Sequence, residues 1–200
     1  MFITFEGGEG TGKSTQLKLL ADRLRGQGVD VLTTREPGGT PEAEAIRNLL
    51  VNGNPDRMSA EAEALLNYAA RDHHLRNVIR PALVKGFTVI CDRFMDSTRA
   101  YQGLAGGASL SFIDALENSI VGETLPDMTL IFDLDPLIGL ERAKARGGAD
   151  RFERKGLEFH QKLRAGFLEI ARQNPSRCKL VDASLPVNDV SALVWQAIHG

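Results

Sequence analysis

A glycine-rich segment near the N-terminus constrains the fold more than any other part of this sequence. Residues 7–14 read GGEGTGKS, which fits the pattern GxxxxGK[ST]. An apolar run at residues 2–5 precedes the segment. After it, apolar residues recur at the spacing of one helix face: Leu17, Leu20, Ala21 and Leu24. A strand, a glycine-rich loop and a helix in this order form a phosphate-binding unit of an α/β sheet. The sequence therefore predicts an α/β fold that binds a polyphosphate.

The residue types of this loop suit the chemistry of a nucleoside triphosphate. Glycines allow φ angles that turn successive N–H groups toward one anion, and the N-terminus of the following helix adds positive potential. We expect Lys13 to reach the β- and γ-phosphates and the Ser14 hydroxyl to bind Mg²⁺. The predicted ATP-binding residues of this segment are Gly7, Gly8, Glu9, Gly10, Thr11, Gly12, Lys13, Ser14 and Thr15.

Composition favours one domain that binds a small anion. A chain of 200 residues with 42% hydrophobic residues can bury one substantial core but is short for two domains. The net charge of −2 provides no basic surface for a nucleic-acid polymer. Cys91 and Cys178 each adjoin an apolar run, which indicates buried thiols in a reducing compartment. We find neither an apolar run of roughly 20 residues nor a signal-peptide pattern, so we expect a cytoplasmic protein with no membrane partner.

Five apolar runs alternate with helical patterns along the chain. They are residues 2–5, 29–33, 87–91, 128–132 and 179–181. This alternation predicts a five-stranded parallel sheet flanked by helices. We expect helices to start at Thr40, at Asp135 and at a capping box that begins with Ser111. Residues 59–85 should form two helices or one bent helix.

Charged residues follow several of these runs, at the sheet edge where α/β proteins bind their ligands. Asp92 and Arg93 follow the third run, and Asp133 follows the fourth. An aspartate in such a position holds Mg²⁺ or its water shell. We favour Asp92, because Arg93 beside it adds a charge that neutralises phosphate. Neither aspartate is followed by glutamate, and the GTPase patterns DxxG and NKxD are missing, so a motor ATPase and a GTPase switch both fit poorly.

A basic segment at residues 142–153 is the second functional signal. Its cations are Arg142, Lys144, Arg146 and Arg151, and a glycine pair lies between the third and the fourth. A solvated helix end has a similar composition. Beside a phosphate-binding loop, a mobile lid is the better interpretation, because lid arginines neutralise the transferring phosphoryl group while the lid excludes water. We expect residues 1–200 to form a single domain with this segment as its lid.

Five motifs in order resemble those of bacterial thymidylate kinases. They are GGEGTGKS at 7–14, TREPGGT at 34–40, YAAR at 68–71, DRFMDST at 92–98 and AYQG at 100–103. The resemblance runs from the first strand to the final helix. It implies the P-loop nucleoside monophosphate kinase fold, phosphorylation of dTMP to dTDP with ATP and Mg²⁺, and a homodimer.

The resemblance also implies which residues handle the phosphates and the metal. Lys13 and the loop amides hold ATP, and Ser14 and Asp92 organise the metal. The family carries its catalytic arginine either in the P-loop or in the lid. Here the P-loop position is Gly10, so the resemblance assigns the catalytic charge to Arg146. It thus implies Lys13, Asp92, Arg93 and Arg146 as the catalytic residues, with Arg142 as a second lid contact to ATP and Lys144 and Arg151 as helpers.

For the acceptor dTMP, the resemblance implies seven residues. Glu9 lies near the sugar, and Glu36 belongs to the loop after the second strand. Arg47 and Arg93 grip the phosphate. The thymine carbonyl edge is bound by Arg71, with Thr98 and Gln102 nearby.

Two residues depart from the family pattern. Asn67 stands where the family often has an aromatic residue that stacks on thymine, and Phe94 stands where tyrosine is common. A kinase for another nucleoside monophosphate or a deoxynucleoside is therefore an alternative, as is a P-loop nucleotide switch that transfers nothing. His73 and His74 point about 100° apart on a helix and share no ligand face, so we interpret both as ordinary helix residues.

Overall fold

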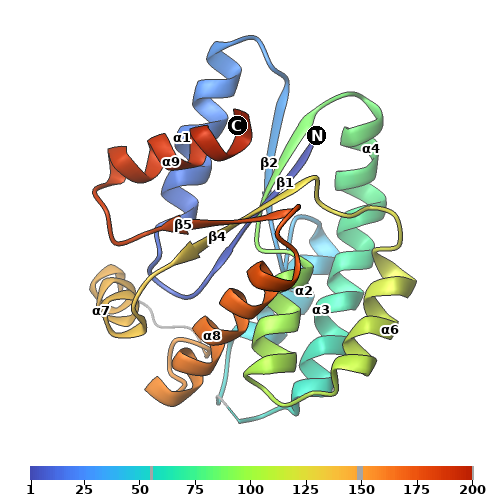
Figure 1. Cartoon of the computed structure of the whole chain (residues 1–200). Coiled ribbons are helices and arrows are strands. Elements are labelled where there is room, and N and C mark those ends of the chain that lie inside the picture. The colour runs from blue at the N-terminus through green and yellow to red at the C-terminus, as the bar shows by residue number, and fades with distance from the viewer. Residues whose placement is uncertain (55, 148–150, 200) are drawn as a thin grey trace.

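The protein is described here by a computed structural model that covers residues 1–54, 56–147 and 151–199, and its centre is a parallel sheet (Figure 1). The strands are β1 Phe2–Gly7, β2 Val31–Arg35, β3 Thr88–Asp92, β4 Met128–Asp133 and β5 Cys178–Asp182. They lie in the order β2-β3-β1-β4-β5, and each neighbouring pair is parallel. The predicted five-stranded parallel sheet is confirmed, with every strand found where an apolar run predicted one.

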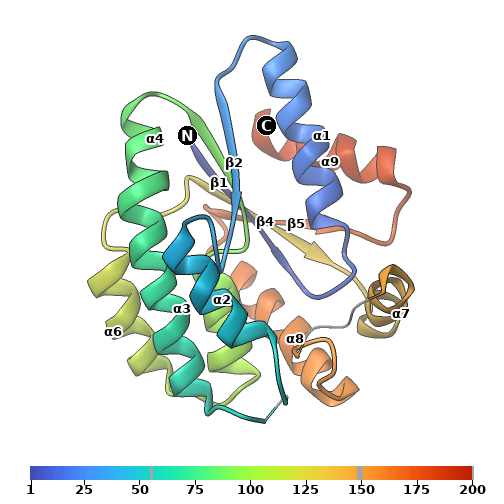
Figure 2. The ribbon, with the colours of Figure 1, turned by 180° about the vertical axis from the view of Figure 1, so that it is seen from behind.

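Helices connect the strands and cover both faces of the sheet (Figures 1 and 2). In chain order they are α1 Lys13–Gly26, α2 Pro41–Val51, α3 Ala60–His74, α4 Arg80–Val84, α5 Met95–Thr98, α6 Leu110–Ile120, α7 Pro136–Arg146, α8 Leu157–Gln173 and α9 Val187–His199. Two π-helical segments, η1 Leu75–Ile79 and η2 Arg99–Leu104, extend α3 and α5.

The two faces of the sheet bury separate apolar clusters, because successive residues of a strand point to opposite faces. On the face covered by α1 and α9, Ile3 and Phe5 pack with helix residues such as Leu17 and Val194. On the other face Phe2 packs with residues of α3, α4 and α6. Every residue of β1 is buried, as expected for the central strand of a parallel sheet.

The segment predicted as two helices or one bent helix contains α3, η1 and α4 in succession. Pro81 explains the change in helix type. Its ring has no N–H and would collide with the carbonyl four residues earlier, that of Asn77. The chain accommodates this with a wider turn, in which the Arg80 amide donates to the Leu75 carbonyl, five residues back.

Two of the three predicted helix starts are confirmed. The Thr40 hydroxyl accepts from the amide of Ala43, and the Asp135 carboxylate accepts from that of Leu137. The third was wrong, because α6 begins at Leu110 and Ser111 already lies in its first turn. The Ser111 hydroxyl bonds the hydroxyl of Ser109 at 2.7 Å instead of capping a backbone amide.

Two further expectations concern the cysteines and the membrane. Cys91 and Cys178 are buried free thiols, as predicted. Among the helices of the described residues, none combines the length and the apolar character that a bilayer crossing requires.

Candidate active site

The glycine-rich loop between β1 and α1 approaches the backbone of α7 very closely. Gly10 and Gly12 have φ of 66° and 84°, in the left-handed region that favours glycine. A Cβ on Gly10 would lie 2.0 Å from the carbonyl oxygen of Gly139, and a Cβ on Gly139 would lie 2.4 Å from that of Glu9. Both glycines are therefore needed to hold α7 against the loop. No arginine fits at position 10 without a shift of α7.

Lys13 lies inside the loop. Its ammonium donates to the carbonyl oxygens of Gly7 and Gly8 at 3.1 and 2.7 Å and to the Thr11 hydroxyl at 3.2 Å. Burial lowers the pKa of Lys13 to about 8, with Arg93 acting in the same direction. A buried ammonium with three donors beside a row of backbone amides is suited to holding phosphate oxygens.

The Ser14 hydroxyl and Asp92 form the polar pair predicted to hold the metal. The hydroxyl donates to Asp92 Oδ2 at 2.8 Å, while Asp92 Oδ1 is buried and has no hydrogen-bond partner within the described residues. Mg²⁺ is commonly held by one carboxylate together with substrate phosphates, so this oxygen fits the ion. Asp133 is engaged elsewhere, because Arg164 binds both its oxygens at 2.7 and 2.9 Å. The geometry favours Asp92 over Asp133.

Arg93 links the loop to β3. Its guanidinium donates to the Gly7 carbonyl and to Glu9 Oε1, both at 2.9 Å, and the hydroxyl of Tyr101 donates to the same oxygen of Glu9. Burial alone would raise the pKa of Glu9, but the charges of Arg93 and Lys13 outweigh it and lower that pKa to about 2. Glu9 is therefore an anion at neutral pH and can accept hydrogen bonds.

The backbone of Arg93 is strained, with φ of 68° in a residue other than glycine. Glu6, in the centre of the sheet, stabilises this turn because its carboxylate accepts from the Phe94 amide at 2.8 Å and from the Ser97 hydroxyl. Burial raises the pKa of Glu6 to about 7. Sequence reasoning missed this residue, since Glu6 ends an apolar run and carries no motif of its own.

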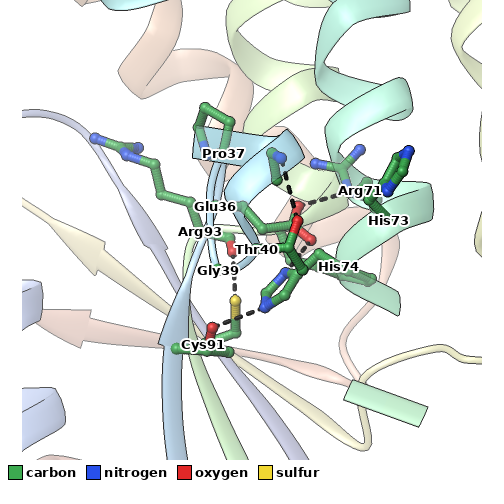
Figure 3. Close-up of polar contacts among 12 residues, drawn as sticks. Glu36, Pro37, Gly39, Thr40, Arg71, His73, His74, Cys91 and Arg93 are labelled. Atoms are coloured by element: carbon green, nitrogen blue, oxygen red, sulfur yellow. Dashed lines mark hydrogen bonds and ion pairs between the residues drawn. The ribbon is translucent and has the colours of Figure 1, made fainter. Parts of the chain in front are cut away.

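Arg71 lies at the other end of the site and is almost completely buried. Its Nε donates to Glu36 Oε2 at 2.7 Å and its Nη2 to the Thr98 hydroxyl at 3.1 Å (Figure 3 shows the pair with Glu36). Burial opposes the positive charge, but the Glu36 carboxylate outweighs it and holds the pKa of Arg71 above its usual value. Nη1 is buried and has no partner among the described residues. A free buried donor of this kind is suited to a carbonyl oxygen.

One cavity of about 280 Å³ joins these two groups of residues. It is lined by most of the predicted site residues, namely Glu9, Gly10, Thr11, Gly12, Lys13, Ser14, Thr15, Glu36, Arg47, Arg71, Asp92, Arg93, Thr98 and Gln102. They belong to segments distant in sequence, which the carboxyl ends of β1, β2 and β3 and the helical segments α2, α3, α5 and η2 bring together. The phosphate-binding loop and the Arg71 pocket therefore open into the same space.

The predicted lid segment reaches this cavity through Phe152 and Glu153, whereas Arg142 does not line it. Arg142 lies on the exposed side of α7 and donates to the Ala183 carbonyl at 3.1 Å. Arg146 is the last residue of α7, and its side chain lies outside what the structure describes, as do residues 148–150 of the predicted lid. The lid and its catalytic arginine stay predictions.

Known proteins resemble this chain over nearly its whole length. The family model described as thymidylate kinase matches residues 5–194. The chain belongs to the thymidylate kinase family. The thymidylate kinase of Caulobacter vibrioides is 60% identical over 98% of this chain and 95% of its own, and that of Afipia carboxidovorans is 53% identical over 99% and 88%.

A solved structure shares the fold of this chain. The crystal structure of thymidylate kinase from Ehrlichia chaffeensis superposes with a TM-score of 0.82 at 38% identity, covering 100% of this chain and 98% of that one. The predicted membership of the thymidylate kinase family and its P-loop fold are confirmed. The predicted reaction, phosphorylation of dTMP, is the one for which the family is named.

Arg151 was predicted as a helper residue in a mobile lid, but in the structure its side chain is held in place. Its side chain is fully buried and donates to Glu63 Oε1 at 2.6 Å and to the Leu50 carbonyl at 2.8 Å. The other oxygen of Glu63 accepts from Gln102 at 2.9 Å. Arg151 is therefore an anchor to α2 and α3. Sequence reasoning missed Glu63, because an acid in the first turn of a helix is ordinary.

The two departures from the thymidylate kinase pattern both lie at the cavity wall. The Asn67 amide donates to the backbone carbonyl of Glu63 at 2.8 Å, so its side chain folds back on α3. Phe94 is fully buried, and the Arg71 guanidinium lies 5.1 Å from its ring centroid. Two further aromatic residues, Tyr101 and Phe152, line the cavity. Their rings pack edge to face, with 5.6 Å between the ring centroids. We did not predict either of them as a site residue.

The interpretation of both histidines as ordinary helix residues was wrong for one of them. His73 is half exposed, and its nearest carboxylate is that of Glu42 at 3.9 Å. His74 is completely buried and contacts Glu36 Oε1 at 2.9 Å through Nδ1. The predicted difference in direction is confirmed, but it places one ring inside the protein.

Proposed function

We propose that the protein transfers the γ-phosphoryl group of ATP to the phosphate of dTMP and releases dTDP and ADP. One observation carries this proposal: a single cavity joins a phosphate-binding loop to a buried arginine with a free donor. An oxygen of the dTMP phosphate attacks the γ-phosphorus, and the bond from that phosphorus to the oxygen bridging it to the β-phosphate breaks. The bridging oxygen leaves with ADP, and no covalent enzyme intermediate is needed.

We call residues 7–15 with Asp92 the donor end of the cavity. The loop amides and Lys13 would hold the β- and γ-phosphates of ATP. The Ser14 hydroxyl and the free oxygen of Asp92 would hold Mg²⁺, which neutralises phosphate charge when it is bound. The carbonyls that now accept from Lys13 show that its ammonium already lies within the loop.

We call Glu36, Arg71, Thr98 and Gln102 the acceptor end of the cavity. Nη1 of Arg71 would donate to the carbonyl edge of thymine, with Thr98 and Gln102 beside it. Between the two ends, Arg47 and Arg93 would grip the acceptor phosphate. The Glu9 carboxylate would accept from the sugar 3′-hydroxyl, because its low pKa keeps it ionised. The acceptor phosphate would then face the γ-phosphate of ATP within the same cavity.

The remaining parts of the proposal rest on the family resemblance. Arg146, helped by Arg142, would stabilise the charge of the transferring group from a lid at residues 142–153 of a single domain. We also propose a homodimer in the cytoplasm. The dimer is tested by sedimentation of the purified protein, where a monomer at micromolar concentration would contradict it.

The test of the reaction is ADP release with Mg²⁺-ATP and a panel of dTMP, dUMP, dCMP, dGMP, AMP and thymidine. The proposal expects the largest kcat/KM with dTMP and little turnover of thymidine, which has no acceptor phosphate. Preference for another acceptor would keep the kinase reaction and reassign the acceptor end. ADP release that no acceptor stimulates would favour a nucleotide switch.

A further inference from the structure

A buried chain of polar contacts lies behind the acceptor end of the cavity (Figure 3). The Thr34 hydroxyl of β2 contacts His74 Nε2 at 2.7 Å, and His74 Nδ1 contacts Glu36 Oε1 at 2.9 Å. The other oxygen of Glu36 accepts from Arg71 Nε at 2.7 Å. The exposed fractions of His74, Glu36 and Arg71 are 0, 4 and 2%, so solvent does not compete for these bonds.

The partners of His74 define which nitrogen carries the proton. Glu36 is paired with the Arg71 guanidinium and acts as an acceptor, so Nδ1 of His74 donates to it. Nε2 then accepts from the Thr34 hydroxyl. With this tautomer every polar atom of the ring has one suitable partner.

The loop after β2 closes over the same ring. Gly39 has φ of 89°, and a Cβ built on it would lie 2.5 Å from His74 Nε2 and 3.0 Å from the Thr34 hydroxyl oxygen. The backbone of the loop therefore touches the imidazole directly. His74 fills the space beneath Glu36 and also supplies the donor that this carboxylate needs.

We propose that His74 is a positioning residue for the acceptor: it holds one oxygen of Glu36 so that the other fixes Arg71 with its Nη1 directed at the base. This inference rests on the proposed function, since the base is that of dTMP. Arg71 alone carries several rotatable bonds, and Glu36 fixes its fork only if Glu36 itself is held. His74 does not touch the base, so it acts through Glu36 and Arg71.

The neighbouring histidine provides a matched control. His73 lies one position earlier on α3 and is half exposed, and within the described residues its carboxylate contact is a long one, to Glu42 at 3.9 Å. His73→Leu makes the same replacement in the same helix, but it removes no hydrogen bond of Glu36. A change of His74 to leucine removes both bonds of the buried ring.

Two polar replacements separate the two nitrogens of His74. His74→Asn places an amide N–H near the position of Nδ1 and can still donate to Glu36. His74→Gln extends the amide beyond that position toward Thr34 and loses the donor to Glu36. A purely structural role of the buried ring predicts the same effect from both replacements.

The experiment measures kcat and KM for dTMP and for ATP, the dTMP to dCMP ratio of kcat/KM, and the melting temperature of the wild type and these four variants. We expect His74→Leu and His74→Gln to raise KM for dTMP about ten-fold, the size of one lost bond to a buried charge, with kcat and KM for ATP nearly unchanged. Both should also reduce the preference for dTMP over dCMP, whose amino group is the wrong partner for Arg71. His74→Asn and His73→Leu should stay within about two-fold of the wild type.

The outcomes are distinct. If the wild type turns over dTMP but His74→Gln keeps its KM and its base preference, the positioning role is overturned. Equal effects of His74→Asn and His74→Gln would also overturn it, and these two variants keep the test valid if His74→Leu does not fold. If the wild type does not act on dTMP at all, the proposed function fails and this inference fails with it.

Discussion

The donor end of the cavity takes nearly all its polar groups from one short stretch of chain, whereas the acceptor end takes them from four separate elements. Residues 7–15 supply backbone amides and Lys13, held in place by glycine geometry. The acceptor end depends on Glu36 after β2, Arg71 on α3, Thr98 on α5 and Gln102 on η2, each fixed by a side-chain bond. The donor end is therefore sensitive to added atoms, and the acceptor end is sensitive to lost partners.

The largest expected effect concerns the predicted lid arginine, which belongs to neither end. Arg146→Ala should reduce kcat by about 10³-fold, because it removes a charge that acts on the transferring group. KM for ATP should change little. Steady-state kinetics checks this, with Arg172→Ala as the control, because Arg172 is exposed on α8 and pairs with Glu169 at 2.7 Å. An unchanged kcat in Arg146→Ala would remove Arg146 from the mechanism.

The next effect is a loss of partners behind the acceptor end. Glu63→Gln removes the carboxylate that the buried Arg151 guanidinium contacts at 2.6 Å, and the free energy of unfolding should fall by about 3 kcal/mol. The control is Glu158→Gln, which breaks an exposed pair with Lys162 and should have no measurable effect. Urea denaturation of both variants tests this. Equal midpoints would show that burial does not distinguish these pairs.

An added methyl group should damage the donor end. In Gly10→Ala the new Cβ would lie 2.0 Å from the Gly139 carbonyl oxygen, so α7 and the loop must separate. A shift of this size in a reacting geometry costs about 10²-fold in kcat/KM. Gly8→Ala in the same loop is the comparison, because within the described residues no atom beyond its two chain neighbours lies within 4 Å of a Cβ built there. If the two variants were equally active, the close approach of α7 would have no role in catalysis.

The smallest expected effect is a difference in pH dependence between the donor end and the acceptor end of the cavity. The pKa of Lys13 is lowered to about 8, so roughly nine-tenths of its charge is present at pH 7 and about one-tenth at pH 9. KM for ATP should rise as pH increases through 8, by up to about ten-fold at pH 9. KM for dTMP should stay constant, because the pKa values of Arg71 and Arg93 are raised and both remain charged. A parallel rise of both KM values would contradict the assignment.

The same contrast explains what sequence reasoning achieved. Apart from Asp92 the donor end is one contiguous segment, so its spacing alone predicted a strand, a loop and a helix, and the structure contains β1, the loop and α1. The family resemblance then supplied the acceptor residues. Fourteen of the predicted site residues, from Glu9 to Gln102, line one cavity. Their roles stay predictions, since no ligand contact tests them.

The supporting residues were beyond the reach of sequence patterns. His74 bonds Glu36 across 38 positions, and Arg151 bonds Glu63 across 88. A histidine beside another histidine, and an arginine within a basic segment, both resemble solvated residues in the sequence. Only the fold shows that each is buried with a carboxylate.

The most direct test of the central claim follows the phosphoryl group itself. ATP labelled in its γ-phosphate is mixed with excess enzyme, Mg²⁺ and dTMP, and the products are separated after a single turnover. If the two ends of the cavity hold donor and acceptor together, the label appears in dTDP, and in Asp92→Asn it does so far more slowly. Label found only in inorganic phosphate would show that water is the acceptor and would contradict the account.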